Sequence, residues 1–384
     1  MGASSWGKCA ILLGGVVLAL LSSGILSESG RAAPLALLGT LIDGTGRPPL
    51  VDGVVLLEGE SIVAVGSRKD VTIPAKARVY RLEGATILPG FINAHVHNTH
   101  SDRTLLEEWA LGGVTTVRDL GAPLGQDWWL RTSDPRFTTV LYAGPIVTVP
   151  GGYPIAGNGF PSLAVTSPED GRRKIEELGR EGADVIKISL ESHAGPILTP
   201  EETIAIVDTA HTLGLPVSVH VTSVSDLRQA VEAGVDDIAH MVRDSVSDTL
   251  LETMVEREIA WIPTLAAIGP AGSTLRRFLD LGGLVALGND SGYLGFDVGM
   301  PMDEIRALAQ AGMTPMEILV ASTQNAACVL RRETTLGTLE AGKQADVLVV
   351  RGDPLADLEA LTDPLLVIHK GVVIRDETAP KPGS

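Results

Sequence analysis

Short apolar runs separated by turn residues occupy both ends of the chain, once the first thirty-odd residues are set aside. The N-terminal group comprises 35–40, 53–58, 61–65 and 78–82, and the C-terminal group comprises 346–350 and 365–373. Apolar segments of this length between Gly- and Asp-containing turns are typical of antiparallel strands. Neither group is long enough to bury a two-sheet core alone. The pattern therefore predicts one small β-sandwich domain assembled from residues 34–87 and 333–384.

Between these groups, over residues 88–332, strand-like runs alternate with helical ones. Helices are expected at 167–182 and 199–213, where apolar residues recur at helical spacing behind a Ser-Pro or Thr-Pro start. Strands are expected at 91–97, 115–119, 138–143, 185–189, 217–221, 237–241, 260–264 and 285–290. Eight strands with crossovers in about 245 residues match a (β/α)8 barrel. The predicted fold class is thus α/β, a TIM barrel with a small β-sandwich domain.

The first 33 residues have a different character from the rest of the chain. Lys8 precedes an uncharged apolar run over 9–22, and small and polar residues follow up to Ala33. A basic start, a short apolar stretch and a small-residue tail are typical of a secretory signal. We expect a signal peptide or an uncleaved N-terminal membrane anchor, and hence export to the periplasm, the outside or the membrane surface. The alternative is a start codon assigned too far upstream of a cytoplasmic enzyme.

Charge and aromatic content narrow the class of partner. The chain has 30 Lys and Arg against 47 Asp and Glu, a formal net charge of -17, and only 4% aromatic residues. An acidic surface repels phosphate backbones, and few aromatic side chains are available for base stacking. A small-molecule substrate is therefore expected rather than a nucleic acid. Homo-oligomer formation stays open.

Metal-ligating side chains fall where the predicted barrel strands end. Residues at i and i+2 of a strand point to the same face, so the two imidazoles of His95-Val96-His97 would aim into the mouth of the barrel. The other candidates lie in predicted strands four, five, six and eight: Lys187, His220, His240 and Asp290. Barrel active sites form at the C-terminal ends of the strands. Each residue alone would more often be structural, but together they indicate a metal site.

The residue types set the kind of metal. Imidazole and carboxylate together suit Zn, Mn, Fe or Ni better than Ca or Mg. Lys187 lies between two isoleucines, and a lysine buried in such a strand is strongly penalised unless it is neutralised or modified.

Several longer motifs carry a resemblance to a known family. They are Leu88-Pro89-Gly90-Phe91-Ile92-Asn93-Ala94-His95-Val96-His97, Gly113-Val114-Thr115-Thr116-Val117-Arg118-Asp119, 234–240, and Gly337-Thr338-Leu339-Glu340-Ala341-Gly342-Lys343-Gln344-Ala345-Asp346. With these motifs the chain resembles the amidohydrolase superfamily over nearly its whole length after residue 34. The set of His, Lys and Asp residues is similar to that of the binuclear subtype. Within the superfamily, the sequence most resembles the imidazolonepropionase-like and prolidase-like group.

The resemblance implies a ligand set for two divalent transition-metal ions, with zinc favoured. In the binuclear subtype the strand-four lysine is carbamylated by CO₂ and bridges the two metals, which implies a carbamate on Lys187. His95, His97, Lys187 and Asp290 would hold the buried metal. Lys187, His220 and His240 would hold the more exposed one.

The same resemblance implies the reaction. The metal pair would activate a hydroxide that attacks a carbon–nitrogen bond of an amide, N-acyl amino acid, dipeptide or cyclic amide. Asp290 would take the proton from water and pass it to the leaving nitrogen, so Asp290 and Lys187 are the catalytic candidates. Two alternatives stay open at this point. The same site could act as a lactonase, esterase or phosphotriesterase, or the barrel could bind metal without catalysis.

Candidates for substrate binding lie on the rim of the predicted barrel. Arg118 closes the second strand, where it either holds a substrate carboxylate or makes a structural ion pair. His100 and His193 follow the first and fourth strands, and Tyr153 belongs to the Pro- and Gly-rich region after the third. These four are candidates to contact substrate or to line the pocket, and the alternative for His100 and His193 is that they are solvated loop residues.

Overall fold

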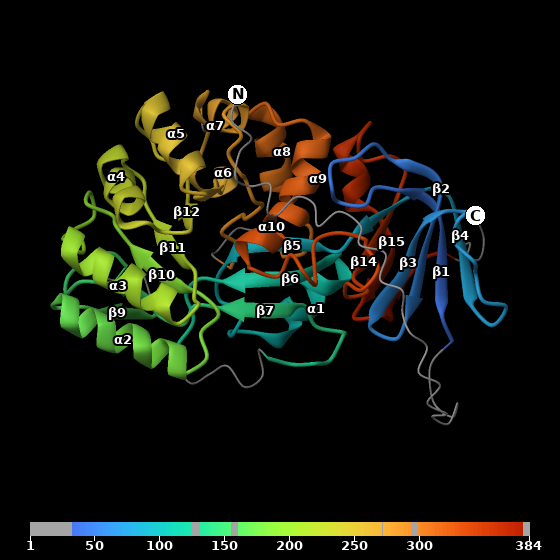
Figure 1. Ribbon diagram of the computed structural model, residues 1–384, viewed down its shortest axis with the longest axis horizontal. Coiled ribbons are helices and arrows are strands. Elements are labelled where there is room, and N and C mark those ends of the chain that lie inside the picture. The colour runs from blue at the N-terminus through green and yellow to red at the C-terminus, as the bar shows by residue number, and fades with distance from the viewer. Residues whose placement is uncertain (1–32, 124–130, 155–159, 271, 293–297, 379–384) are drawn as a thin grey trace.

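The computed structural model describes residues 33–123, 131–154, 160–270, 272–292 and 298–378 (Figure 1). The predicted leader, apart from Ala33, lies outside the described residues. Within the described part of the chain, none of the helices combines the length and the apolar character needed to span a membrane.

Strands from both chain ends form one mixed sheet of seven strands in the order β16-β15-β14-β4-β1-β2-β3. The strands are β1 (Leu35–Leu41), β2 (Leu50–Glu58), β3 (Ser61–Ser67), β4 (Arg78–Pro89), β14 (Val347–Arg351), β15 (Pro364–His369) and β16 (Val372–Asp376). Figure 1 shows the blue N-terminal strands beside the red C-terminal ones, at the right of the molecule. The small β domain expected from both chain ends is therefore present, and its strands hydrogen-bond as a single sheet.

The long strand β4 joins the two halves of this sheet. It pairs with β1 along most of its length, from Leu35 opposite Arg78 to Leu41 opposite Ile87, and its last part also pairs with β14, where Val349 lies opposite Ile87. The side chains of this sheet form one apolar core that contains residues from both chain ends, including Leu37, Ile87 and Val349.

The barrel is built from parallel strands in the centre of the chain. One sheet has the order β5-β6-β7, and a second has the order β13-β12-β11-β10-β8-β9. The strands are β5 (Phe91–Val96), β6 (Val114–Asp119), β7 (Thr139–Tyr142), β8 (Ile146–Thr148), β9 (Ser162–Ala164), β10 (Ile186–Ser189), β11 (Val217–His220), β12 (Asp237–Ala239) and β13 (Ala260–Ile262). Seven of the eight predicted barrel strands thus have counterparts, and β8 and β9 are additional.

A break at Gly144 and Pro145 separates the third predicted strand from the additional strand β8, and the two sheets divide there. Strand β7 ends before Gly144 and Pro145, and β8 resumes after them to pair with β10. Gly144 has φ +72, a left-handed conformation that glycine adopts without strain, and Pro145 cannot donate a backbone hydrogen bond.

The eighth predicted strand, 285–290, closes the barrel without forming a regular strand. It makes parallel bridges from Val285 to Trp261 and from Ser291 to Val96. Gly288 is needed here because a Cβ at this position would lie 2.7 Å from the Cβ of His95. The chain therefore joins β13 to β5 and brings residue 290 beside the first strand.

Helices surround the barrel, and the two helix starts expected from the sequence, at α2 and α3, are present. They are α1 (Arg103–Leu111), α2 (Pro168–Arg180), α3 (Pro200–Thr212), α4 (Val224–Ala233), α5 (Asp248–Glu256), α6 (Leu265–Ile268), α7 (Thr274–Asp280), α8 (Met302–Gln310), α9 (Pro315–Ala321) and α10 (Gln324–Val329), with a 3₁₀ turn, η2 (Leu358–Thr362). The Ser167 side chain caps α2, and Thr199 forms a capping box with Glu202 at α3.

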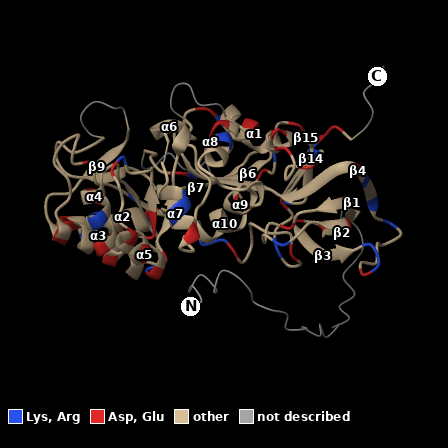
Figure 2. Cartoon of the chain, turned by 90° about the horizontal axis from the view of Figure 1, so that it is seen from above, with Lys and Arg blue, Asp and Glu red and all other residues tan. Residues whose placement is uncertain are grey.

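The outer surface of these helices carries much of the charge. Figure 2 shows acidic segments on α2, α3 and α5, whereas the inward faces of α2 and α5 contribute buried Ile175 and Leu251 to the main apolar core. The charged outer face and the apolar inner face of each helix determine which side packs against the strands. The helices therefore cover the sides of the barrel, and the strand ends are available to form a site.

Candidate metal centre

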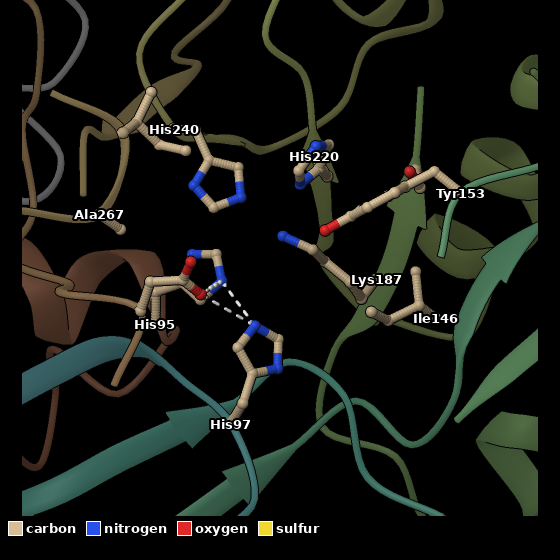
Figure 3. A pocket seen from close by; sticks show the side chains of 11 residues that line it. His95, His97, Ile146, Tyr153, Lys187, His220, His240 and Ala267 are labelled. Atoms are coloured by element: carbon tan, nitrogen blue, oxygen red, sulfur yellow. Dashed lines mark hydrogen bonds and ion pairs between the residues drawn. The ribbon is translucent and has the colours of Figure 1, made fainter. Parts of the chain in front are cut away.

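The six side chains predicted to bind metal line one cavity of about 350 Å³ (Figure 3). They come from the ends of β5, β10, β11 and β12 and from the segment that closes the barrel: His95, His97, Lys187, His220, His240 and Asp290. The rest of the lining is Ile146, Tyr153, Ser189, Ala267 and Ile268. Residues up to 195 positions apart in sequence therefore converge as the barrel topology requires.

Three of these residues form a compact donor cluster at the end of β5. Asp290 Oδ1 lies 3.2 Å from His95 Nε2 and 3.1 Å from His97 Nε2, and the two imidazole nitrogens are 3.2 Å apart. Figure 3 shows the dashed lines that join them. One ligand atom from each residue lies within 4.8 Å of the others, a spacing that a single metal ion could bridge.

Backbone geometry aims two of the ligands. His240 follows the last residue of β12, Asp290 lies in the irregular segment that closes the barrel, and the two have φ of +74 and +60. Left-handed conformations are uncommon for residues other than glycine and indicate that the surrounding structure holds them. The Trp261 indole donates to the His240 carbonyl at 2.7 Å, and Asp290 N donates to the His95 carbonyl at 2.9 Å. The two side chains thereby turn into the cavity.

Lys187 is buried in β10, and its Nζ has no hydrogen-bond partner among the described residues. Burial lowers the pKa of Lys187 to about 7, although the carboxylates of Asp237 and Asp290 work in the opposite direction. An amine with this pKa is largely uncharged at slightly alkaline pH. The strand therefore presents to the cavity an unpartnered amine that loses its proton near neutral pH.

The two remaining imidazoles each have a partner behind them. His220 Nε2 lies 3.2 Å from Glu191 Oε2, and His240 Nδ1 lies 2.7 Å from Thr264 Oγ1. Their ring centroids are 4.4 Å apart, so the two rings are neighbours in the cavity. Burial lowers the pKa of both histidines, which favours the neutral imidazole that binds metals.

The charge of the cluster is carried by the carboxylate. Burial tends to raise the pKa of Asp290, but the adjacent imidazoles outweigh it and lower this pKa well below its usual range. Burial lowers the pKa of His95 well below its usual range. We therefore assign a neutral imidazole to His95 and an ionised carboxylate to Asp290, the protonation states that suit a divalent cation.

Comparison with known protein families agrees with this geometry. A model described as the amidohydrolase family matches residues 86–374. The chain belongs to the amidohydrolase family.

Individual relatives place the amidohydrolase among hydrolases of carbon–nitrogen bonds. Ochratoxinase from Aspergillus niger is 23% identical, with 86% of this chain and 84% of that protein covered. A Bos taurus protein described as an imidazolonepropionase is 30% identical over 186 residues, 46% of this chain and 42% of that protein. A solved structure from Bifidobacterium longum, described as a prolidase, has a TM-score of 0.78 and 28% identity, covering 90% of this chain and 95% of that one. The predicted family, fold class and enzyme class are confirmed.

Of the two interpretations of Arg118 in the amidohydrolase, a contact to a substrate carboxylate or a structural ion pair, the structure has the ion pair. Its side chain is 1% exposed, and its guanidinium donates to both oxygens of Asp237 at 2.8 and 3.0 Å. A third donor, Nε, reaches the Ala94 carbonyl at 2.8 Å. Arg118 is therefore a buried structural ion pair between β6 and β12, away from the cavity lining.

The other three substrate-binding candidates occupy different places. Tyr153 lines the cavity, and its ring centroid lies 4.8 Å from that of His220 (Figure 3). His193 is exposed on the rim, with Nδ1 3.6 Å from Glu191 Oε1. His100 is half-buried after β5 and is not part of the cavity lining. Of these three, only Tyr153 is placed to touch a molecule in the cavity.

Sequence reasoning missed the residues behind and beside the ligands. Glu191 and Thr264 contact the imidazoles of His220 and His240, and Ile146 and Ile268 form apolar walls. Glu191 follows β10 by two residues, so its place past the end of a ligand-bearing strand was the one available signal. Thr264 and the isoleucines carry no such signal.

Proposed function

We propose that this amidohydrolase holds two divalent transition-metal ions among its six clustered side chains and hydrolyses an amide-type carbon–nitrogen bond. The observation that carries the proposal is the convergence of four imidazoles, one carboxylate and one unpartnered lysine on a single cavity. Imidazole and carboxylate donors favour zinc, with Mn, Fe or Ni as alternatives.

The donor set fits a metal pair. His95, His97 and Asp290 provide three ligand atoms within 4.8 Å of one another. The Lys187 amine, with a pKa of about 7, is available in the neutral form that adds CO₂ to give a carbamate with release of a proton. A carbamate would convert a buried, unpartnered amine into an anionic bridging ligand, which accounts for a lysine at this position.

The chain's own residues divide the work of the reaction. When bound, the metal ions would supply the Lewis acidity that ionises water near neutral pH and polarises a carbonyl. His95 and His97 would hold one ion and His220 and His240 the other, with the modified Lys187 between them. Asp290, kept ionised beside His95 and His97, would accept the proton of the attacking water and pass it to the leaving nitrogen.

The cavity wall favours an apolar substituent next to the scissile bond. Ile146, Ala267 and Ile268 and the ring of Tyr153 border the donors. Burying apolar surface against them contributes about 25 cal/mol per Å². We therefore propose amides whose acyl or amine part is aliphatic or aromatic.

The test is a comparison of kcat/KM for a panel of neutral apolar amides, N-acyl amino acids, Xaa-Pro dipeptides, lactones and phosphotriesters. We expect the highest values for amides with an apolar substituent. Turnover of lactones or phosphotriesters with no measurable amide hydrolysis would overturn the assignment of a carbon–nitrogen bond. Turnover that is unaffected by complete removal of metal would overturn the metal pair.

A further inference from the structure

Glu191 lies in the turn directly after β10 and reaches sideways to the end of β11. It is 7% exposed, although no sequence motif marks it. Its Oε2 lies 3.2 Å from His220 Nε2 and accepts a hydrogen bond from Thr222 Oγ1 at 2.5 Å. Strands β10 and β11 pair in parallel with Ser189 opposite His220, which sets the distance that the glutamate side chain must span.

The carboxylate is held from both sides. Thr222 lies two residues beyond His220 on the same chain segment, and the exposed His193 approaches the other oxygen at 3.6 Å. A carboxylate fixed in this way can only accept hydrogen bonds from the imidazole.

A hydrogen-bond acceptor at one nitrogen of a neutral imidazole favours the tautomer that carries its proton on that nitrogen. With Glu191 at Nε2, the proton belongs on Nε2 and the lone pair on Nδ1. In metal sites the partner of the second nitrogen orients the ring and raises its basicity, and its loss typically costs 10–100-fold in metal affinity or activity.

We propose that Glu191 is a positioning residue that holds His220 with Nδ1 directed to the metal, an inference that rests on the proposed metal-dependent function. The neighbouring histidine provides the contrast. His240 Nδ1 contacts the Thr264 hydroxyl at 2.7 Å, a group that can donate or accept and so does not impose one tautomer by itself. Of His220 and His240, only His220 has an obligate acceptor as the partner described here.

The experiment has two readouts on Glu191→Gln, which keeps the size of the side chain but introduces a donor. The first is the nitrogen-15 spectrum of the histidine rings in metal-free protein, with the His220 signals assigned by their loss in His220→Asn. Wild type should carry the proton on Nε2, and the variant should show a mixture of tautomers. The second is competition titration of metal-free protein with Zn²⁺ against a chelator. One of the two sites should weaken by about 10–100-fold and the other should be unchanged.

Two further variants guard against a purely structural effect. Glu202→Gln removes a carboxylate of similar burial, 8% exposed, from the capping box of α3 and should leave both readouts as in wild type. Thr222→Val removes the second partner of Glu191 without touching His220, and should weaken the same metal site by a smaller factor.

A proton on Nδ1 of His220 in wild type, or equal Zn²⁺ affinities in wild type and Glu191→Gln, would overturn the role of Glu191. Binding of fewer than two Zn²⁺ ions by wild type would instead overturn the proposed function. The two failures are therefore distinguishable. If Glu191→Gln is unfolded by thermal melting, the Thr222→Val titration decides alone.

Discussion

The buried pair of Arg118 and Asp237 offers a prediction whose size follows from the structure. Both side chains are 1% exposed, and two parallel hydrogen bonds of 2.8 and 3.0 Å join them. The change to make is Arg118→Met, which keeps the length of the side chain but removes its charge. Asp237 then remains as a buried carboxylate that has lost both hydrogen bonds from the guanidinium.

Breaking a buried ion pair by removing one partner costs about 3–5 kcal/mol, mainly because the remaining charge has lost its partner. The pair is not exposed to water, so solvent screening does not reduce this range. With a urea m value of about 3 kcal/mol per M, the midpoint of unfolding should fall by about 1–1.7 M. The double variant Arg118→Met/Asp237→Leu should recover much of the loss, because neither charge is left behind.

Urea unfolding of the wild type, both single variants and the double variant measures this. The KM of the folded Arg118→Met protein for any hydrolysed substrate should stay near that of wild type, since Arg118 does not line the cavity. A midpoint within a few tenths of a molar of wild type, together with a large rise in KM for substrates with a carboxylate, would refute the structural role.

Three further predictions concern single residues. Lys187→Ala should abolish activity, and short carboxylic acids should restore part of it by replacing the carbamate; full activity of the variant would exclude a bridging role. Asp290→Asn should retain much of its metal and lose about 10²–10⁴ in kcat, measured with metal content on the same sample, and near-normal turnover would remove Asp290 as the proton carrier. Glu304 is fully buried, and burial raises its pKa from 4.5 to about 8, so the folded protein holds this proton more tightly than the unfolded chain. The tighter proton binding of Glu304 stabilises the folded protein fully below about pH 4.5, and this stabilisation is lost as pH rises through about 8. Glu304→Gln should therefore flatten the free energy of unfolding against pH over this range. An unchanged curve would contradict the assignment.

The strand ends and their chemistry could be predicted from the sequence because each ligand is part of a local pattern. The i, i+2 spacing of His95 and His97 fixes their shared side of a strand, and Lys187 and His220 lie inside short apolar runs. Such patterns depend only on residues that are close in sequence, so a single sequence is enough to detect them. The six predicted ligands consequently line one cavity, as the barrel prediction required.

What could not be predicted depends on contacts between distant segments. Arg118 finds Asp237 119 residues later, so its environment follows only from the barrel closing. The irregular closing segment results from the close approach of Gly288 to His95 and from the left-handed backbone at Asp290. The pattern of hydrophobic residues along the chain predicts neither the close approach of Gly288 to His95 nor the left-handed backbone at Asp290. Glu191 was missed for a similar reason, because its importance lies in reaching the neighbouring strand rather than in its own position.

The most direct test of the central claim is the metal content of active protein, measured by elemental analysis on samples whose amide-hydrolysing turnover is recorded at the same time. Protein produced with transition metal and bicarbonate should contain close to two metal ions per chain. Turnover should disappear as a chelator removes them and return as they are added back. Full turnover in protein that elemental analysis shows to be metal-free would contradict the account.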